Sequence, residues 1–135
     1  MRTFDIQGIA INVSRSKALA FIADPARLPD WTEAFSSVSE GHATMRTPNG
    51  EVGVGLDVRV SGDAGTVDWA MTFPDGSVAT AYSRVIEAGT DRCIYGFILT
   101  PPPVPLEQLE GTLEAQSRTL TGELERLKEI LEHDA

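Results

Sequence analysis

The sequence predicts one α+β domain over residues 1–135: a strongly curved antiparallel sheet of about six strands, two short helices after the first strand, and a long C-terminal helix across the sheet. Three observations lead to this prediction. The first segment alternates like a strand, the middle has a period of two interrupted by turn signals, and the end carries leucines at helical spacing. A chain of 135 residues, 41% of them hydrophobic, is long enough to bury its own core.

The first strand is expected over Thr3–Val13. In this prediction Phe4 and Ile6 share one face of the strand, and the alternation changes phase at Gly8. A glycine at such a change indicates a β-bulge.

Two short helices should follow this strand. Ser14 is a suitable N-cap for a helix over Arg15–Ala23. Asp24 as an N-cap, with Pro25 in the first helical position, predicts a second short helix. A continuing helix would then place Trp31 and Phe35 on one side.

The middle of the chain predicts a meander of hairpin-linked strands, because glycine-containing turn signals recur between alternating segments. The expected strands are Val38–Thr47, Glu51–Ser61, Thr66–Phe73, Ser77–Glu87 and Arg92–Leu99. In the second of them Val54 and Leu56 alternate with Gly53 and Gly55. The face with Val54 and Leu56 is expected to be buried and the opposite face exposed to solvent.

Leucines from Leu106 to Leu131 recur at the spacing of a long amphipathic helix. The apolar stripe lapses at Gln116-Ser117, about midway along. Because the sheet has one apolar face and the helix one apolar stripe, the simplest burial lays the helix across the sheet.

Charge and composition narrow the classes of partner. The formal net charge of −9 excludes the electrostatic footprint of a nucleic-acid-binding protein, and we expect no membrane insertion. Asp5 precedes any apolar stretch, so no signal peptide is expected and the predicted location is cytoplasmic. Cys93, His42 and His133 lie at no metal-ligand spacing, so we expect no metal site. Gly53 and Gly55 lie within strand alternation and lack the third glycine of a dinucleotide-binding loop, and we expect no cofactor.

The segment Ala18–Trp31, with Asp24-Pro25, Leu28-Pro29 and Trp31, is similar to the polyketide cyclase/dehydrase-type branch of the START-like (SRPBCC) superfamily. The order of elements resembles the helix-grip fold of that superfamily. The resemblance implies an apolar cavity between the C-terminal helix and the sheet. It implies binding of a small hydrophobic molecule, such as a polyketide, lipid or aromatic metabolite, by a monomer or homodimer. The alternative is a cyclase or dehydratase that uses polar pocket residues for acid/base chemistry.

Candidate ligand-binding residues lie on the apolar faces of these elements and at the lapse in the leucine stripe. They are Trp31, Trp69, Met71, Tyr82, Tyr95, Leu113, Gln116, Ser117 and Leu120. For Trp31 the alternative is an aromatic anchor of the short helices, and for Trp69 and Met71 it is ordinary core. Gln116 and Ser117 either offer a hydrogen bond to the ligand or mark a drift of the stripe toward solvent.

Three residues are candidates for acid/base catalysis: His42, Tyr82 and Arg84. A histidine titrates near neutral pH, although a lone strand histidine is more often structural. Tyr82 and Arg84 share one face of their strand, and the sequence leaves open whether that face points into the cavity or outward. Burying an arginine without a partner is costly, which favours the outward alternative.

Overall fold

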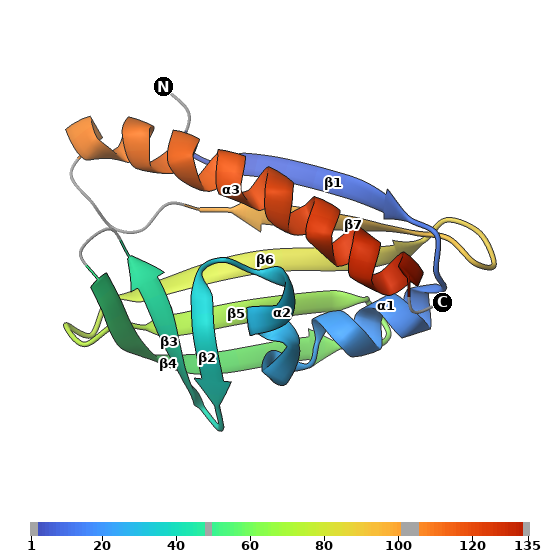
Figure 1. The fold of residues 1–135 in the computed structure, drawn as a ribbon, viewed down its shortest axis with the longest axis horizontal. Helices are drawn as coiled ribbons and strands as arrows, with labels where there is room; N and C mark the ends of the chain where they lie inside the picture. Colours follow the sequence, from blue (N-terminus) through green and yellow to red (C-terminus); the bar gives the residue numbers. More distant parts are fainter. Residues whose placement is uncertain (1–2, 48–49, 101–105, 134–135) are drawn as a thin grey trace.

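A curved antiparallel sheet and a long helix form the molecule in the computed structural model, which describes residues 3–47, 50–100 and 106–133, with side chains from Leu113 onward in the last range (Figure 1). The elements are β1 (Asp5–Ile11), α1 (Arg15–Ile22), the 3-10 turn η1 (Pro25–Arg27), α2 (Leu28–Trp31), β2 (Phe35–Ser39), β3 (His42–Thr47), β4 (Gly50–Ser61), β5 (Thr66–Thr72), β6 (Val78–Glu87), β7 (Cys93–Leu99) and α3 (Leu106–His133).

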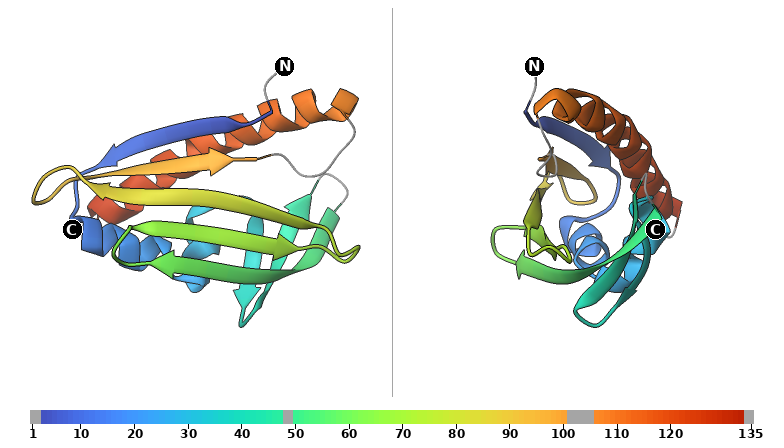
Figure 2. Two further views of the ribbon diagram at one scale, coloured as in Figure 1. Left: turned by 180° about the vertical axis from the view of Figure 1, so that it is seen from behind. Right: turned by 90° about the vertical axis from the view of Figure 1, so that its left-hand side faces the viewer.

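The strands form one sheet in the order β1-β7-β6-β5-β4-β3-β2, with every neighbouring pair antiparallel. The sheet curves around α1 and α2, and α3 runs diagonally beside β1 (Figure 2). We call the side of the sheet that faces these helices the inner face, and the opposite side the outer face. This is the predicted arrangement of a helix laid across a curved sheet.

The short helices begin where the capping residues predicted them. Ser14 accepts a hydrogen bond from the Lys17 backbone N–H (3.2 Å), and the Asp24 carboxylate accepts one from Ala26 N–H (3.1 Å). Each side chain satisfies a donor that the first helical turn leaves unpaired.

The sheet has seven strands rather than about six, because the predicted strand Val38–Thr47 is wrong. A hairpin turn at Glu40-Gly41 divides this segment into β2 and β3, and Gly41 has a φ of 72°. Phe35 begins β2, so it does not continue the helix of Trp31, although both side chains are buried. Gly41 supplies the left-handed conformation that the tight turn between β2 and β3 requires.

The predicted bulge at Gly8 is also wrong. β1 pairs with β7 without a register shift, and Gly8 lies opposite Gly96. The alternation therefore continues unbroken and puts Asp5 and Gln7 on the inner face, while Ile6 is 62% exposed on the outer face. The polar residues are tolerated inside because α3 provides their hydrogen-bond partners.

The core lies between α3 and the inner face. The leucine stripe of α3 is buried there at Leu120, Leu124, Leu127 and Leu131, and it joins one cluster with α1, α2 and the strands. Over the described residues, no helix is long and apolar enough to cross a membrane.

Candidate functional site

Four aromatic rings meet on the inner face. Trp31, at the end of α2, lies with its ring centroid 6.3 Å from those of Trp69 on β5 and Tyr95 on β7. Phe97 stacks on Trp69 (5.9 Å, 26° between planes) and contacts Tyr95 edge-on (6.3 Å). We call these four residues the aromatic cluster; all are buried.

The cluster spans three strands because the strand between its members carries small side chains. Trp69 is opposite Ala81 on β6, and Phe97 is opposite Ser83 on the same strand. Ala81 and Ser83 leave room above β6, so that the large rings of β5 and β7 reach each other across it. Offset and edge-to-face ring pairs of this kind stabilise by about 0.5–1.5 kcal/mol beyond the burial of their area.

Four polar atoms in the described interior, three of them in the aromatic cluster, are buried without a partner. They are the indole Nε1 atoms of Trp31 and Trp69, the hydroxyl of Tyr95 and Oε1 of Gln116 on α3; within the described part of the chain none has a hydrogen-bond partner. Leaving such a group unsatisfied costs about 1–3 kcal/mol, and folded proteins rarely leave several together. The set comprises two donors, one hydroxyl that donates or accepts, and one acceptor.

Tyr95 is completely buried, and desolvation raises the pKa of its phenol far above the ordinary range. The Ser83 side chain lies near enough to the phenol to lower this pKa in part, although its hydroxyl does not have the geometry of a hydrogen bond to Tyr95, and the charge of Glu123 raises the pKa further. The Ser83 hydroxyl itself donates to the carbonyl of Val67 (2.7 Å). Tyr95 therefore stays protonated at physiological pH, and its hydroxyl is available as a hydrogen-bond donor rather than as a base.

Glu123 is the ionisable group that α3 presents to the connection between α2 and β2. Its carboxylate accepts a hydrogen bond from the Glu33 backbone N–H (2.6 Å). Desolvation raises the pKa of Glu123, the backbone N–H groups of Glu33 and Ala34 lower it in part, and the charge of Glu33 raises it further.

The structure brings three of the predicted ligand-binding residues into contact with one another. Trp31, Trp69 and Tyr95 belong to the aromatic cluster, Gln116 contributes an unpartnered oxygen, and Met71, Leu113 and Leu120 are buried. Trp69 and Met71 occupy the inner face of β5, as the alternation predicted.

Ser117 is half-buried and forms its hydrogen bonds with β1. Its hydroxyl donates to the Asp5 carboxyl (2.7 Å), and Gln7 Nε2 donates to the Ser117 carbonyl oxygen (2.9 Å). Its donor is thus engaged with β1 rather than directed at the aromatic cluster.

The three predicted catalytic residues do not reach the inner face. β6 turns Ala81, Ser83 and Val85 inward, so Tyr82 and Arg84 lie on the outer face, which resolves the open alternative. Tyr82 is 45% exposed, and Arg84 Nε donates to the carbonyl of Ala64 (2.9 Å). His42 is exposed on the outer side of β3, beside an open hollow.

Sequence reasoning missed Phe97, Ser83 and Glu123 at this site. Phe97 had a signal, since it follows Tyr95 by two positions and so shares its face. Glu123 had none, because it is one acid among many on the polar side of α3. In the described residues, no group of three or more histidine, cysteine, aspartate or glutamate side chains is arranged to hold a metal.

Several solved structures have a fold similar to that of this chain. No family model matches the sequence, and no curated protein matches it. A START superfamily protein from Mycobacterium smegmatis is 11% identical, with a TM-score of 0.65 over 95% of this chain and 98% of that one. The Zhui aromatase/cyclase from a Streptomyces species is 9% identical (TM-score 0.72; 96% and 93% covered).

A norcoclaurine synthase point mutant from Thalictrum flavum, solved with a transition-state analogue, is 14% identical, with a TM-score of 0.66 over 98% of this chain and 96% of that one. The chain therefore has the START-like, helix-grip fold that its sequence predicted. At such identities the likeness concerns the fold alone.

Proposed function

We propose that this protein binds a small, largely apolar ligand with at least one hydrogen-bonding group, in the interior between α3 and the inner face of the sheet. The observation that carries the proposal is the three unpartnered polar atoms of the aromatic cluster, together with a fourth, Gln116 Oε1, on α3. An apolar guest with a hydroxyl or carbonyl would satisfy some of them and would contact the rings through its apolar part.

The chemistry of the site favours a neutral guest. Tyr95 and the two indoles are uncharged, and the raised pKa of Glu123 shows that its surroundings disfavour added negative charge. Proteins of the same fold with names such as aromatase/cyclase and norcoclaurine synthase are consistent with a polyketide or aromatic metabolite as the ligand class.

A matched pair of probes tests this proposal. 1-Naphthol and naphthalene share one apolar skeleton, and only the first carries a hydroxyl. Displacement of bound Nile red should show saturable binding of both, with 1-naphthol up to about tenfold tighter, since one net hydrogen bond is worth about 0.5–1.5 kcal/mol. Native mass spectrometry of freshly purified protein would identify a retained natural ligand.

Variants locate the hydrogen bond. Tyr95→Phe or Gln116→Leu should abolish the preference for 1-naphthol while leaving naphthalene binding in place. Tyr82→Phe is the matched control, because it makes the same chemical change on the outer face. The proposal fails if neither probe saturates, or if the preference survives in both interior variants.

A second candidate is an enzyme of the cyclase or dehydratase type, favoured by one observation: the Tyr95 hydroxyl is buried, protonated and unpartnered. Such a donor is suited to hydrogen-bond a substrate carbonyl and stabilise developing negative charge on its oxygen. Turnover of a poly-β-ketone probe that is lost in Tyr95→Phe and kept in Tyr82→Phe would support the enzyme over the carrier.

A further inference from the structure

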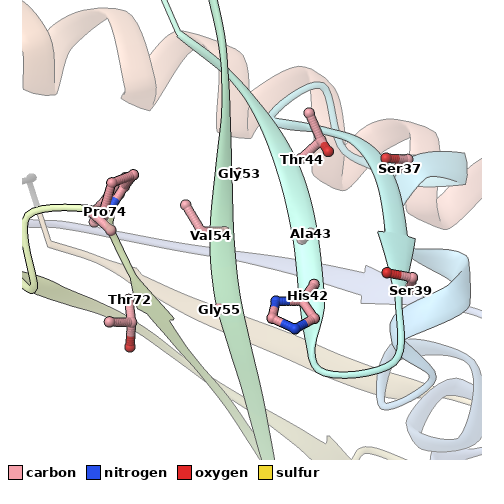
Figure 3. Close-up of a pocket in the computed structure, with 11 residues that line it drawn as sticks. Ser37, Ser39, His42, Ala43, Thr44, Gly53, Val54, Gly55, Thr72 and Pro74 are labelled. Atoms are coloured by element: carbon pink, nitrogen blue, oxygen red, sulfur yellow. The ribbon is translucent and has the colours of Figure 1, made fainter.

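A hollow lies on the outer face, away from the aromatic cluster. It is open to solvent, has a volume of about 360 Å³, and extends over β2 to β5 near the ends of β4 and β5 (Figure 3). A volume near 300 Å³ is the lower end of the range for small-molecule sites. Nothing in the proposed interior function uses this surface.

The register of the strands explains the hollow. Ser39, His42, Gly55 and Thr72 occupy one row of cross-strand neighbours on the outer face, so a bare glycine separates the imidazole from the threonine hydroxyl. In the next row on the same face, Gly53 is the cross-strand neighbour of Thr44, so the backbone of β4 is bare there too. Since adjacent strands are about 4.8 Å apart, the walls on β3 and β5 are roughly 10 Å apart across the exposed backbone of β4.

Neither glycine is required by backbone geometry. Gly53 and Gly55 do not have positive φ angles. An added Cβ at Gly53 would meet no atom within 4 Å, and one at Gly55 would make an ordinary 3.6 Å contact with Thr72 Cβ. Glycine weakens a strand interior, and it often marks a place where a ligand or another backbone approaches closely.

The walls of the hollow carry hydroxyl and imidazole side chains beside apolar ones. Thr44, His42 and Ser39 line one side, and Thr72 and Pro74 line the other, across the backbone of β4 (Figure 3). As far as the described residues go, the side chains of Ser39, His42, Thr44 and Thr72 have no hydrogen-bond partner. They are available to donate to, and accept from, a bound molecule.

Two of the charged residues near the borders, Arg46 and Asp57, have partners outside the hollow. Arg46 Nη1 donates to the carbonyl of Glu33 (2.9 Å), and Asp57 forms an ion pair with Arg59 (3.1 Å). The lining contains no aspartate, glutamate, lysine or arginine, and a chain with a net charge of −9 repels anions in general. The hollow therefore suits neither an anion nor a cation, and its open, hydroxyl-lined walls do not suit an alkyl chain.

We propose that this hollow binds a neutral polyhydroxylated ring of monosaccharide size. Such a ring has a C–H face that can lie on the bare backbone of Gly53 and Gly55 and against Pro74. Its hydroxyls can reach Thr44, His42 and Thr72 on the two walls at the same time. The site is separate from the interior, so it exists whether or not the proposed interior ligand binds.

The test is a titration of the ¹⁵N-labelled full chain with myo-inositol, glucose and galactose, followed by two-dimensional NMR up to about 100 mM, because small polar ligands with few contacts bind in the millimolar range. At least one probe should give saturable shifts centred on the amides of Thr44, Gly53 and Gly55. Nile red binding in the interior should not change.

Filling variants give the decisive comparison. Gly53→Val and Gly55→Ala should weaken probe binding about tenfold or more, with the melting temperature unchanged or higher, since strand propensity improves. Gly96→Val is the matched control, because Gly96 is another strand glycine on the outer face with no atom within 4 Å of an added Cβ. Thr72→Val removes a wall hydroxyl without changing the shape, and it should also weaken binding.

The proposal is overturned if no probe saturates, if the shifts centre on the inner face, or if Gly53→Val and Gly55→Ala bind as tightly as Gly96→Val. It is also overturned if phenol, a planar ring with one hydroxyl, binds this hollow more tightly than every polyol. None of these outcomes depends on the 1-naphthol experiment, so the two proposals can fail separately.

Discussion

The Ser117 hydroxyl, in the middle of α3, donates a 2.7 Å hydrogen bond to the Asp5 carboxyl, which lies 112 positions earlier at the start of β1. Gln7 extends this connection, since its amide donates to the Ser117 carbonyl (2.9 Å) and accepts from the Thr121 hydroxyl (2.9 Å). The polar residues on the inner face of β1 therefore contact α3 at the position where its leucine stripe is interrupted. Together they join the first strand to the last helix.

We expect Ser117→Ala to lower the free energy of unfolding by about 1–3 kcal/mol, because it removes a partner of the buried Asp5 carboxyl. Urea unfolding at constant pH measures the change. Ser39→Ala, an exposed serine on the outer face, is the control and should lie within about 0.5 kcal/mol of the natural protein. A neutral Ser117→Ala would show that the hydrogen bond adds nothing to stability.

Leu120→Ala should destabilise the protein by about 2–5 kcal/mol, because Leu120 is 2% exposed within the core between α3 and the sheet. The same range is expected for Leu113→Ala, at a side chain that is 1% exposed. Chemical unfolding checks both variants. Losses below about 1 kcal/mol at both positions would mean that α3 is peripheral to the fold.

Gly122→Ala should stabilise the protein by up to about 1 kcal/mol. Gly122 is exposed within α3, and an added Cβ would meet no atom within 4 Å, so alanine adds helix propensity without a clash. A lower melting temperature would contradict this.

Gly65→Ala is the contrasting case and should be strongly destabilising. Gly65 has a φ of +75°, and an added Cβ would lie 2.3 Å from the carbonyl oxygen of Val85. That carbonyl belongs to the backbone of a central strand and cannot move aside easily. A Gly65→Ala protein as stable as the natural one would contradict the turn geometry.

Glu123 should make the protein less stable as the pH rises. Desolvation raises its pKa in the folded protein, so between the ordinary value of 4.5 and the raised value the folded state binds more protons than the unfolded state. Stability therefore falls as the pH rises through that window. Glu123→Gln keeps an acceptor for the Glu33 N–H and should remove this part of the dependence, leaving the variant as stable or more stable at pH 7.

The opposite sign is expected at Glu132, which provides the control. Its pKa is lowered by a hydrogen bond from Lys128 and another from the Asn12 backbone N–H, so its contribution is present above the ordinary value and is lost as the pH falls through the lowered one. The free energy of unfolding of Glu123→Gln and of Glu132→Gln should be measured across about pH 3–8. Relative to the natural protein, the pH dependence of the two variants should change in opposite directions. Parallel curves would contradict both assignments.

The amino-acid sequence by itself determined the features that depend on near neighbours. Ser14 and Asp24 capped their helices, the apolar face of β5 pointed inward at Trp69, and the leucine stripe formed one long helix, because each depends on residues within a turn or a strand. These elements were enough to indicate the helix-grip arrangement.

Only the tertiary structure decided which face of a strand is inside when both faces are mixed. Asp5 and Gln7 turn inward because Ser117 and Thr121 of α3, more than a hundred positions away, provide their partners. Tyr82 and Arg84 turn outward because the small side chains of β6 let the rings on β5 and β7 meet above it. No local pattern contains either reason, since a strand's register places its side chains only when the partner strands and the covering helix are known.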